Sequence, residues 1–105
     1  MTSSPRLQQI EAMLADEPND PELRYMLAME RVSLGDDAGA AQAFHDLIAI
    51  APEYPPAYHM GGRTLQRLGR LSEARKLLER GIPIALRIGN EHAAGEMQGL
   101  LESLD

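Results

Sequence analysis

The sequence repeats with a period of 34 residues, and this repeat limits the possible folds more than any other feature. Positions one period apart carry the same or a similar side chain, and the matches include glycine and proline as well as apolar residues. A period between about 20 and 50 residues is typical of arrays in which one small structural unit stacks on the next. The matched pairs are Pro18 and Pro52, Pro21 and Pro55, Met26 and Met60, Leu34-Gly35 and Leu68-Gly69, Ala40 and Ala74, Phe44 and Leu78, Ile48 and Ile82, and Ile50 and Ile84.

Each unit has the signals of two helices. Asp20 is a good N-cap, Pro21 suits the first helical position, and Gly35 suits the left-handed residue that ends a helix. A second helix follows from the aspartates behind Gly35 and ends before Pro52. We therefore expect an all-α fold in one domain over 1–105, with a half-repeat helix at 5–17, a first repeat at 20–52, a second repeat at 55–88 and a capping helix at 90–104.

The spacing of small and aromatic residues within the units resembles that of the tetratricopeptide repeat (TPR) family. The resemblance covers roughly residues 21–88 and extends to small bacterial TPR proteins of unassigned function. It implies an α-α superhelix of about two helical hairpins with a further helix at each end. The residues that carry it are Ala40-x3-Phe44 followed by Pro52, which match the second helix of a repeat, and Tyr58-x2-Gly61-Gly62-x2-Leu65, which match the first.

Several residues depart from the family pattern at positions that affect shape. Arg24 and Arg31 stand where two aromatic residues are usual. Gly61 stands where leucine is usual, so we expect loose packing in the second hairpin. Pro83 removes a backbone hydrogen bond, which predicts a long, bent helix from about 71 to 88.

A last helix is predicted over about 91–103, after Gly89 and the capping residue Asn90. We interpret it as a cap that covers the end of the array and faces solvent on its other side. Its apolar stripe consists of Ala93, Met97, Leu100 and Leu104.

The charge of the chain argues against some kinds of partner. The 105 residues carry a formal net charge of −6, whereas binding to nucleic acid or to an anionic membrane needs a basic face. The sequence contains no cysteine, and its first residues show no apolar signal segment. We therefore expect a cytoplasmic protein that binds neither nucleic acid nor membranes.

No group of residues predicts catalysis, a cofactor or a metal site. His92 and Glu96 share one helix face, but two ligands are too few for a metal ion, so an ordinary i,i+4 pair is expected. His45 and Asp46 are adjacent and point in different directions on a helix, which makes a poor acid–base pair. We expect no enzyme, no cofactor and no metal ion.

The family resemblance implies a binding groove, because the first helix of each TPR unit lines the concave side of the array. One stripe there is rich in methionine and tyrosine, and its neighbour carries His59, Arg63 and Arg67 at steps of four residues. Methionine adapts to varied partners, and arginine binds a carboxylate through two parallel hydrogen bonds. We call this set the predicted groove: Tyr25, Met26, Met29, Val32, Ser33, His59, Met60, Arg63, Gln66 and Arg67.

The predicted groove favours a protein–protein interaction or scaffold module that binds a peptide or partner helix with an acidic residue or a free C-terminus. The clamp that the chaperone-binding branch of the family uses is absent, because Tyr25 and Met29 occupy its first-unit positions. Two alternatives stay open. Arg63 and Arg67 are solvated or paired within the chain, or the groove or a hairpin face is buried by the last helix or in a homo-oligomer.

Overall fold

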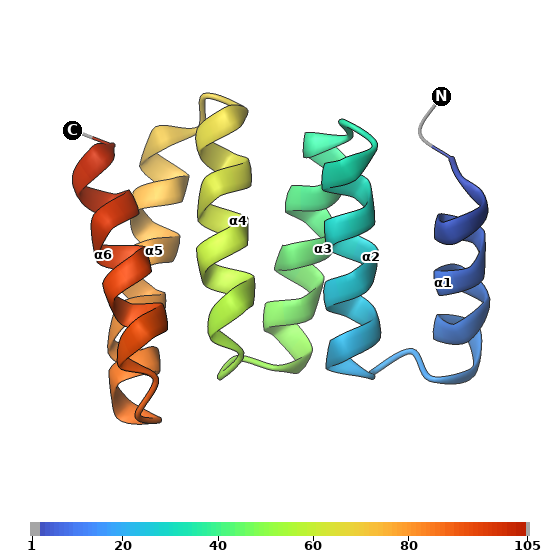
Figure 1. Ribbon diagram of the computed structural model, residues 1–105, viewed down its shortest axis with the longest axis horizontal. Coiled ribbons are helices and arrows are strands. Elements are labelled where there is room, and N and C mark those ends of the chain that lie inside the picture. Colours follow the sequence, from blue (N-terminus) through green and yellow to red (C-terminus); the bar gives the residue numbers. More distant parts are fainter. Residues whose placement is uncertain (1–2, 105) are drawn as a thin grey trace.

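The computed structural model describes residues 3–104, which form six helices joined by short loops (Figure 1). Residues 1, 2 and 105, which the single-domain prediction included, lie outside this range. The helices stand side by side in an open array, with the two chain ends at opposite sides of it. They are α1 (Pro5–Asp16), α2 (Pro21–Ser33), α3 (Asp37–Ile50), α4 (Pro55–Arg67), α5 (Leu71–Arg87) and α6 (Glu91–Ser103).

Capping side chains and proline determine where most of these helices begin. Oδ1 of Asp20 accepts hydrogen bonds from two backbone N–H groups in the first turn of α2, at 2.9 and 3.3 Å. Ser4, Asp36 and Asn90 cap α1, α3 and α6 in a similar way. Proline occupies the first turn of α1, α2 and α4, where its missing N–H leaves no helical hydrogen bond unmade.

Three glycines reverse the chain after α2, α4 and α5. Gly35, Gly69 and Gly89 have φ angles of 76°, 76° and 82°, a region that other residues enter at a steric cost. Such a residue ends the helix tightly and lets the next one pack back against it.

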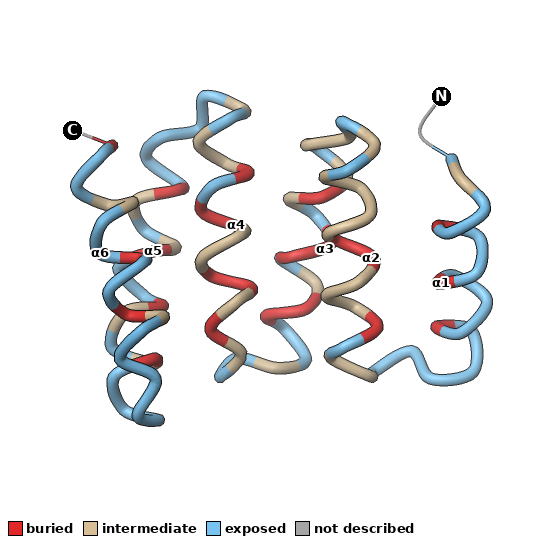
Figure 2. The backbone as a smooth tube through the Cα atoms, viewed as in Figure 1, coloured by how far each residue is buried: buried red, intermediate tan, exposed pale blue. Residues whose placement is uncertain are grey.

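The repeats follow one another in space as they do in sequence. Helices α2 and α3 form one hairpin, α4 and α5 form the next, and the hairpins join through α3 and α4. At the ends, α1 packs against α2, while α6 packs against α5 and α4. Figure 2 shows that buried positions recur along each helix, so the core continues through the array. The largest fully buried side chains are Tyr58, Phe44, Ile10, Leu47, Leu78, Met97 and Thr64.

Gly81 lets α5 approach both α4 and α6 closely. A Cβ atom at this position would lie 2.5 Å from Cβ of Tyr58 and 2.7 Å from Sδ of Met97. The buried hydroxyl of Tyr58 donates a hydrogen bond of 2.7 Å to the carbonyl of Pro52, so its polar atom is satisfied.

The predicted all-α fold is confirmed, with two helical hairpins and a further helix at each end within residues 3–104. Helix α5 is continuous and contains the exposed Pro83, while the predicted bend stays a prediction. Met97 and Leu104 of the predicted α6 stripe are buried, and Ala93 and Leu100 are half-buried. Along residues 3–104, no helix has the length and apolar character that a membrane span needs.

Candidate functional site

Helix α2 holds the apolar part of the predicted groove in a half-buried state. Ser33, at the end of the helix, is exposed. A shallow hollow of about 350 Å³ opens beside these residues, and it is lined by Arg6, Tyr25, Met26, Met29, Glu30 and Ser33. The half-buried residues of the predicted groove on this helix are Tyr25, Met26, Met29 and Val32.

The acidic side of this hollow is tied to α1. The side chain of Glu30 is 12% exposed, and its Oε1 lies 3.3 Å from Nε of Arg6. Its other oxygen accepts a hydrogen bond of 2.9 Å from the hydroxyl of Ser4. The charges of Arg6 and Glu30 are thus paired with each other. The hollow therefore offers a ligand apolar surface and no unpaired cation.

Tyr25 belongs to a cluster of three aromatic rings. Its ring centroid lies 5.7 Å from that of Tyr54 and 6.1 Å from that of Phe44, at tilted angles. Burial raises the pKa of Tyr25, and the neighbouring Tyr54 raises it further. Burial also raises the pKa of Tyr54, with smaller contributions from Glu22 and Asp20. Both hydroxyls are therefore protonated at neutral pH and able to donate hydrogen bonds.

Tyr54 is a candidate residue that the sequence analysis missed. It lies just before α4 and makes no side-chain capping hydrogen bond there. One period earlier the same position holds Asp20, which does cap its helix. The replacement of a cap by an aromatic side chain was the available signal.

The two arginines of α4 differ in their partners. Nε and Nη2 of Arg67 donate hydrogen bonds of 3.2 and 3.1 Å to Oδ1 of Asp37. Arg63 is exposed and makes no hydrogen bond or ion pair with the residues from 3 to 104. The sequence left open whether these arginines are solvated or paired within the chain. Arg67 is paired, and Arg63 is solvated. Met60 and Gln66 are half-buried.

Helix α6 reaches the histidine end of the predicted groove. Nδ1 of His59 lies 4.0 Å from Oε1 of Glu96, and Nε2 of His92 lies 3.4 Å from the same oxygen. Burial lowers the pKa of His59; Glu96 opposes this effect, while Arg63 and His92 add to it. His59 is therefore mainly neutral at neutral pH, and α6 packs against α4 at this end of the predicted groove.

The fold thus brings a third side chain to the predicted pair of His92 and Glu96. Even so, no group of three or more His, Cys, Asp or Glu side chains within the described part of the chain is arranged to hold a metal ion.

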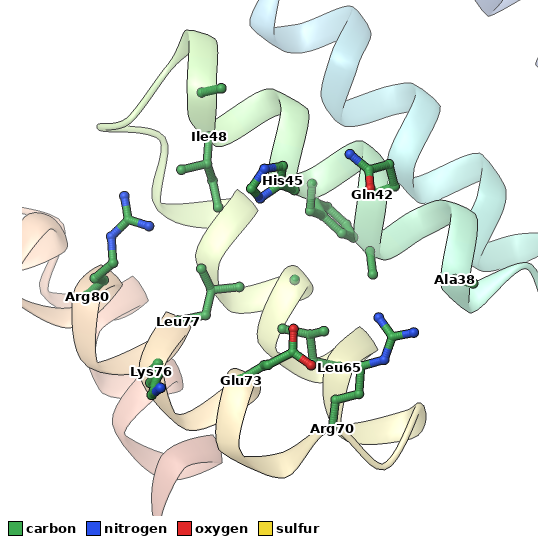
Figure 3. A pocket seen from close by; sticks show the side chains of 14 residues that line it. Ala38, Gln42, His45, Ile48, Leu65, Arg70, Glu73, Lys76, Leu77 and Arg80 are labelled. Atoms are coloured by element: carbon green, nitrogen blue, oxygen red, sulfur yellow. The ribbon is translucent and has the colours of Figure 1, made fainter.

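A second hollow, of about 540 Å³, lies between α3 and α5, which are the second helices of the two hairpins (Figure 3). Residues of α4 also line it. We call it the α3–α5 hollow. The sequence analysis missed it, although Lys76 and Arg80 lie four residues apart on one helix. Its lining residues are Ala38, Ala41, Gln42, Phe44, His45, Ile48, Ala49, Gly61, Leu65, Arg70, Glu73, Lys76, Leu77 and Arg80.

The expectation of loose packing at Gly61 concerns this hollow, which the glycine lines. A Cβ atom on Gly61 would lie 2.9 Å from Cδ2 of Leu77 and 3.4 Å from Cβ of Phe44. Leu77 and Phe44 therefore pack closely at Gly61, and the glycine is buried.

Comparison with known proteins agrees with this architecture. A model of the family described as tetratricopeptide repeat matches residues 31–87, which is more than half of the chain. The chain belongs to the tetratricopeptide repeat family. No curated protein matches the sequence significantly.

Several solved structures share the fold. A tetratricopeptide repeat domain protein from Salinibacter ruber is 28% identical with a TM-score of 0.76, over 81% of this chain and 94% of that one. A protein from Bordetella parapertussis is 26% identical with a TM-score of 0.83, over 97% of this chain and 89% of that one. The first TPR of Spaghetti, bound to an HSP90 peptide, is 23% identical with a TM-score of 0.75, over 93% of this chain and 78% of that one.

Proposed function

We propose that this TPR protein is a non-enzymatic interaction module that binds a peptide or partner helix along the predicted groove. TPR folds generally mediate contacts between proteins, which supports the class of function. The observation that carries the proposal is Arg63, an exposed cation without a partner within residues 3–104. It lies three residues after the half-buried Met60 on the same side of α4.

The surroundings of Arg63 favour a ligand with a carboxylate next to apolar groups. Arg67 is already held by Asp37, and the histidine of α4 faces a carboxylate of α6. Arg63 is therefore the free cation of the predicted groove, and its guanidinium can bind a carboxylate through two hydrogen bonds. The half-buried methionines of α2 provide adaptable apolar surface.

The test is affinity capture from the native cell, followed by binding measurements with the captured partner. We expect Arg63→Glu to weaken binding at least about tenfold, since it replaces attraction by repulsion at the binding site. Arg87→Glu is the matched control, because it makes the same charge change at an exposed residue of α5 that lies outside the predicted groove and lines neither hollow. Equal affinity of the wild type and Arg63→Glu, with unchanged helicity, rejects the groove as the site.

Self-association is a second candidate function, favoured by exposed apolar residues at the end of α5. Leu86 and Ile88 are 54% and 46% exposed, and the nearby Pro83 is exposed as well. If copies join through this surface, the mass from light scattering increases with protein concentration, and replacing both residues by serine restores the monomer mass. A monomer mass of the wild type at every concentration rejects this candidate.

A further inference from the structure

We propose that the α3–α5 hollow is a second docking site, which takes an acidic amphipathic helix from a partner protein. The proposal does not depend on the predicted groove, because the groove lies on the first helices and this hollow lies between the second helices (Figure 3).

The hollow has an apolar inner wall, in which glycine replaces a larger residue of the preceding repeat. Phe44, Leu65 and Leu77 line it together with Gly61. One period earlier the position of Gly61 holds Leu27, which is buried in the core. At Gly61 a Cβ atom would lie 2.9 Å from Cδ2 of Leu77, so Leu77 covers the glycine. The half-buried side chains of Leu65 and Leu77 are the apolar surface that a ligand can cover.

The length of the hollow suits a short helix. Its lining residues extend from Ala38 to Ala49 on α3, and from Arg70, the residue just before α5, to Arg80 on α5. At a rise of about 1.5 Å per residue, this stretch is roughly 15 Å long, or about three helical turns. A helix that docks in such a groove presents apolar side chains at i, i+3 or i+4, and i+7.

The rim of the hollow is basic although the protein is acidic. Arg70, Lys76 and Arg80 line it with a single carboxylate, that of Glu73, whereas the whole chain carries a net charge of −6. Arg70 and Lys76 are exposed and form no ion pair within residues 3–104. Their charges are thus available to attract an acidic helix and to repel a basic one.

Arg80 is held in position without being neutralised. Its Cζ lies 5.4 Å from the ring centroid of Tyr58, and its Nη2 lies 3.5 Å from the hydroxyl oxygen of that residue. Tyr58 is fully buried and bonded to the carbonyl of Pro52, so it is a fixed support. A cation held in this way loses less freedom when it binds, and its other N–H groups remain free for a carboxylate.

The experiment is a titration of ¹⁵N-labelled protein with two synthetic helical peptides, followed by amide chemical shifts. Both peptides carry leucine at i, i+4 and i+7; one has glutamate between the leucines and the other has lysine. We expect the glutamate peptide to cause saturable shifts in α3 and α5, with little effect from the lysine peptide. The double variant Arg70→Glu/Lys76→Glu should bind the glutamate peptide at least about tenfold more weakly. A single exposed ion pair contributes less than this, but the double variant replaces two attractive contacts with two repulsive ones.

Arg63→Glu separates this site from the predicted groove. It should bind the glutamate peptide like the wild type, whatever its effect on the captured partner of the groove. Shifts confined to α2 and α4, equal binding of the lysine peptide, or full affinity of the double variant would each overturn the proposal. Absence of saturable binding overturns it as well. A doubled protein mass, with broadening of amide signals confined to α3 and α5, also overturns it, because the occupant of the hollow is then a second copy of this chain.

Discussion

Gly81 and Gly99 are both glycines inside helices, but only Gly81 has atoms close to where a Cβ would lie. At Gly81 the nearest is Cβ of Tyr58 at 2.5 Å, which cannot move without its backbone, whereas no atom lies within 4 Å at Gly99. Gly81→Ala should lower the free energy of unfolding by about 1 kcal/mol, because overpacking exceeds the gain in helix propensity. Gly99→Ala should raise it by about 0.5–1 kcal/mol. Urea unfolding measures both, and an increase for Gly81→Ala would contradict the close approach of α4 and α5.

The pKa of His59, lowered mainly by burial, makes stability depend on pH in a defined direction. Below the unfolded pKa of about 6.5, the unfolded chain binds the proton more readily than the folded one. The free energy of unfolding should therefore decrease as pH falls from 7 to 5, until the folded pKa is passed. His59→Gln should flatten this slope in urea unfolding at several pH values. The control is His45→Gln, at an exposed residue of α3 outside the group of His59, Glu96 and His92; equal slopes for the two variants would count against burial of His59 as the cause.

Among the helices, α5 contains a residue that opposes its own secondary structure. Pro83 lies inside Leu71–Arg87 and is exposed, so it removes a backbone hydrogen bond without being part of the buried core. Pro83→Ala should raise the free energy of unfolding by about 1–3 kcal/mol. If the predicted bend is present and positions α6, the same variant also shifts the amide signals of His59 and Glu96. A stability equal to that of the wild type would show that the proline costs nothing in this helix.

The helices could be predicted from the sequence because their signals are local. Caps such as Asp20, glycines such as Gly35 and the repeat period act over a few residues, and each helix lies close to its predicted position. The state of the arginines in the groove could not be predicted. Whether Arg67 is paired depends on Asp37, which is 30 residues away in sequence. The α3–α5 hollow likewise depends on three helices meeting, with Gly61 contributing no side chain.

Over the whole molecule, the two ends of the array are held differently. Helix α6 packs on both α5 and α4, whereas α1 packs on α2 through Leu7, Ile10 and Leu14. In a repeat array each unit is stabilised mainly by its neighbours, so an end helix with one main partner opens more easily than an internal one. The polar contacts of Glu30 with Ser4 and Arg6 are an additional link between α1 and α2.

This difference predicts an order of local opening that hydrogen exchange can measure. Amides of α1 should exchange faster than those of α4, because α4 is enclosed by α3, α5 and α6. Glu30→Ala should speed exchange in α1 further, since it removes both links, and should leave exchange in α4 and α5 unchanged. Arg87→Ala is the matched control, because it removes the exposed ion pair with Glu53 far from α1. Faster exchange throughout the chain in Glu30→Ala would show that the array opens as one unit, and equal protection of α1 and α4 in the wild type would show the same.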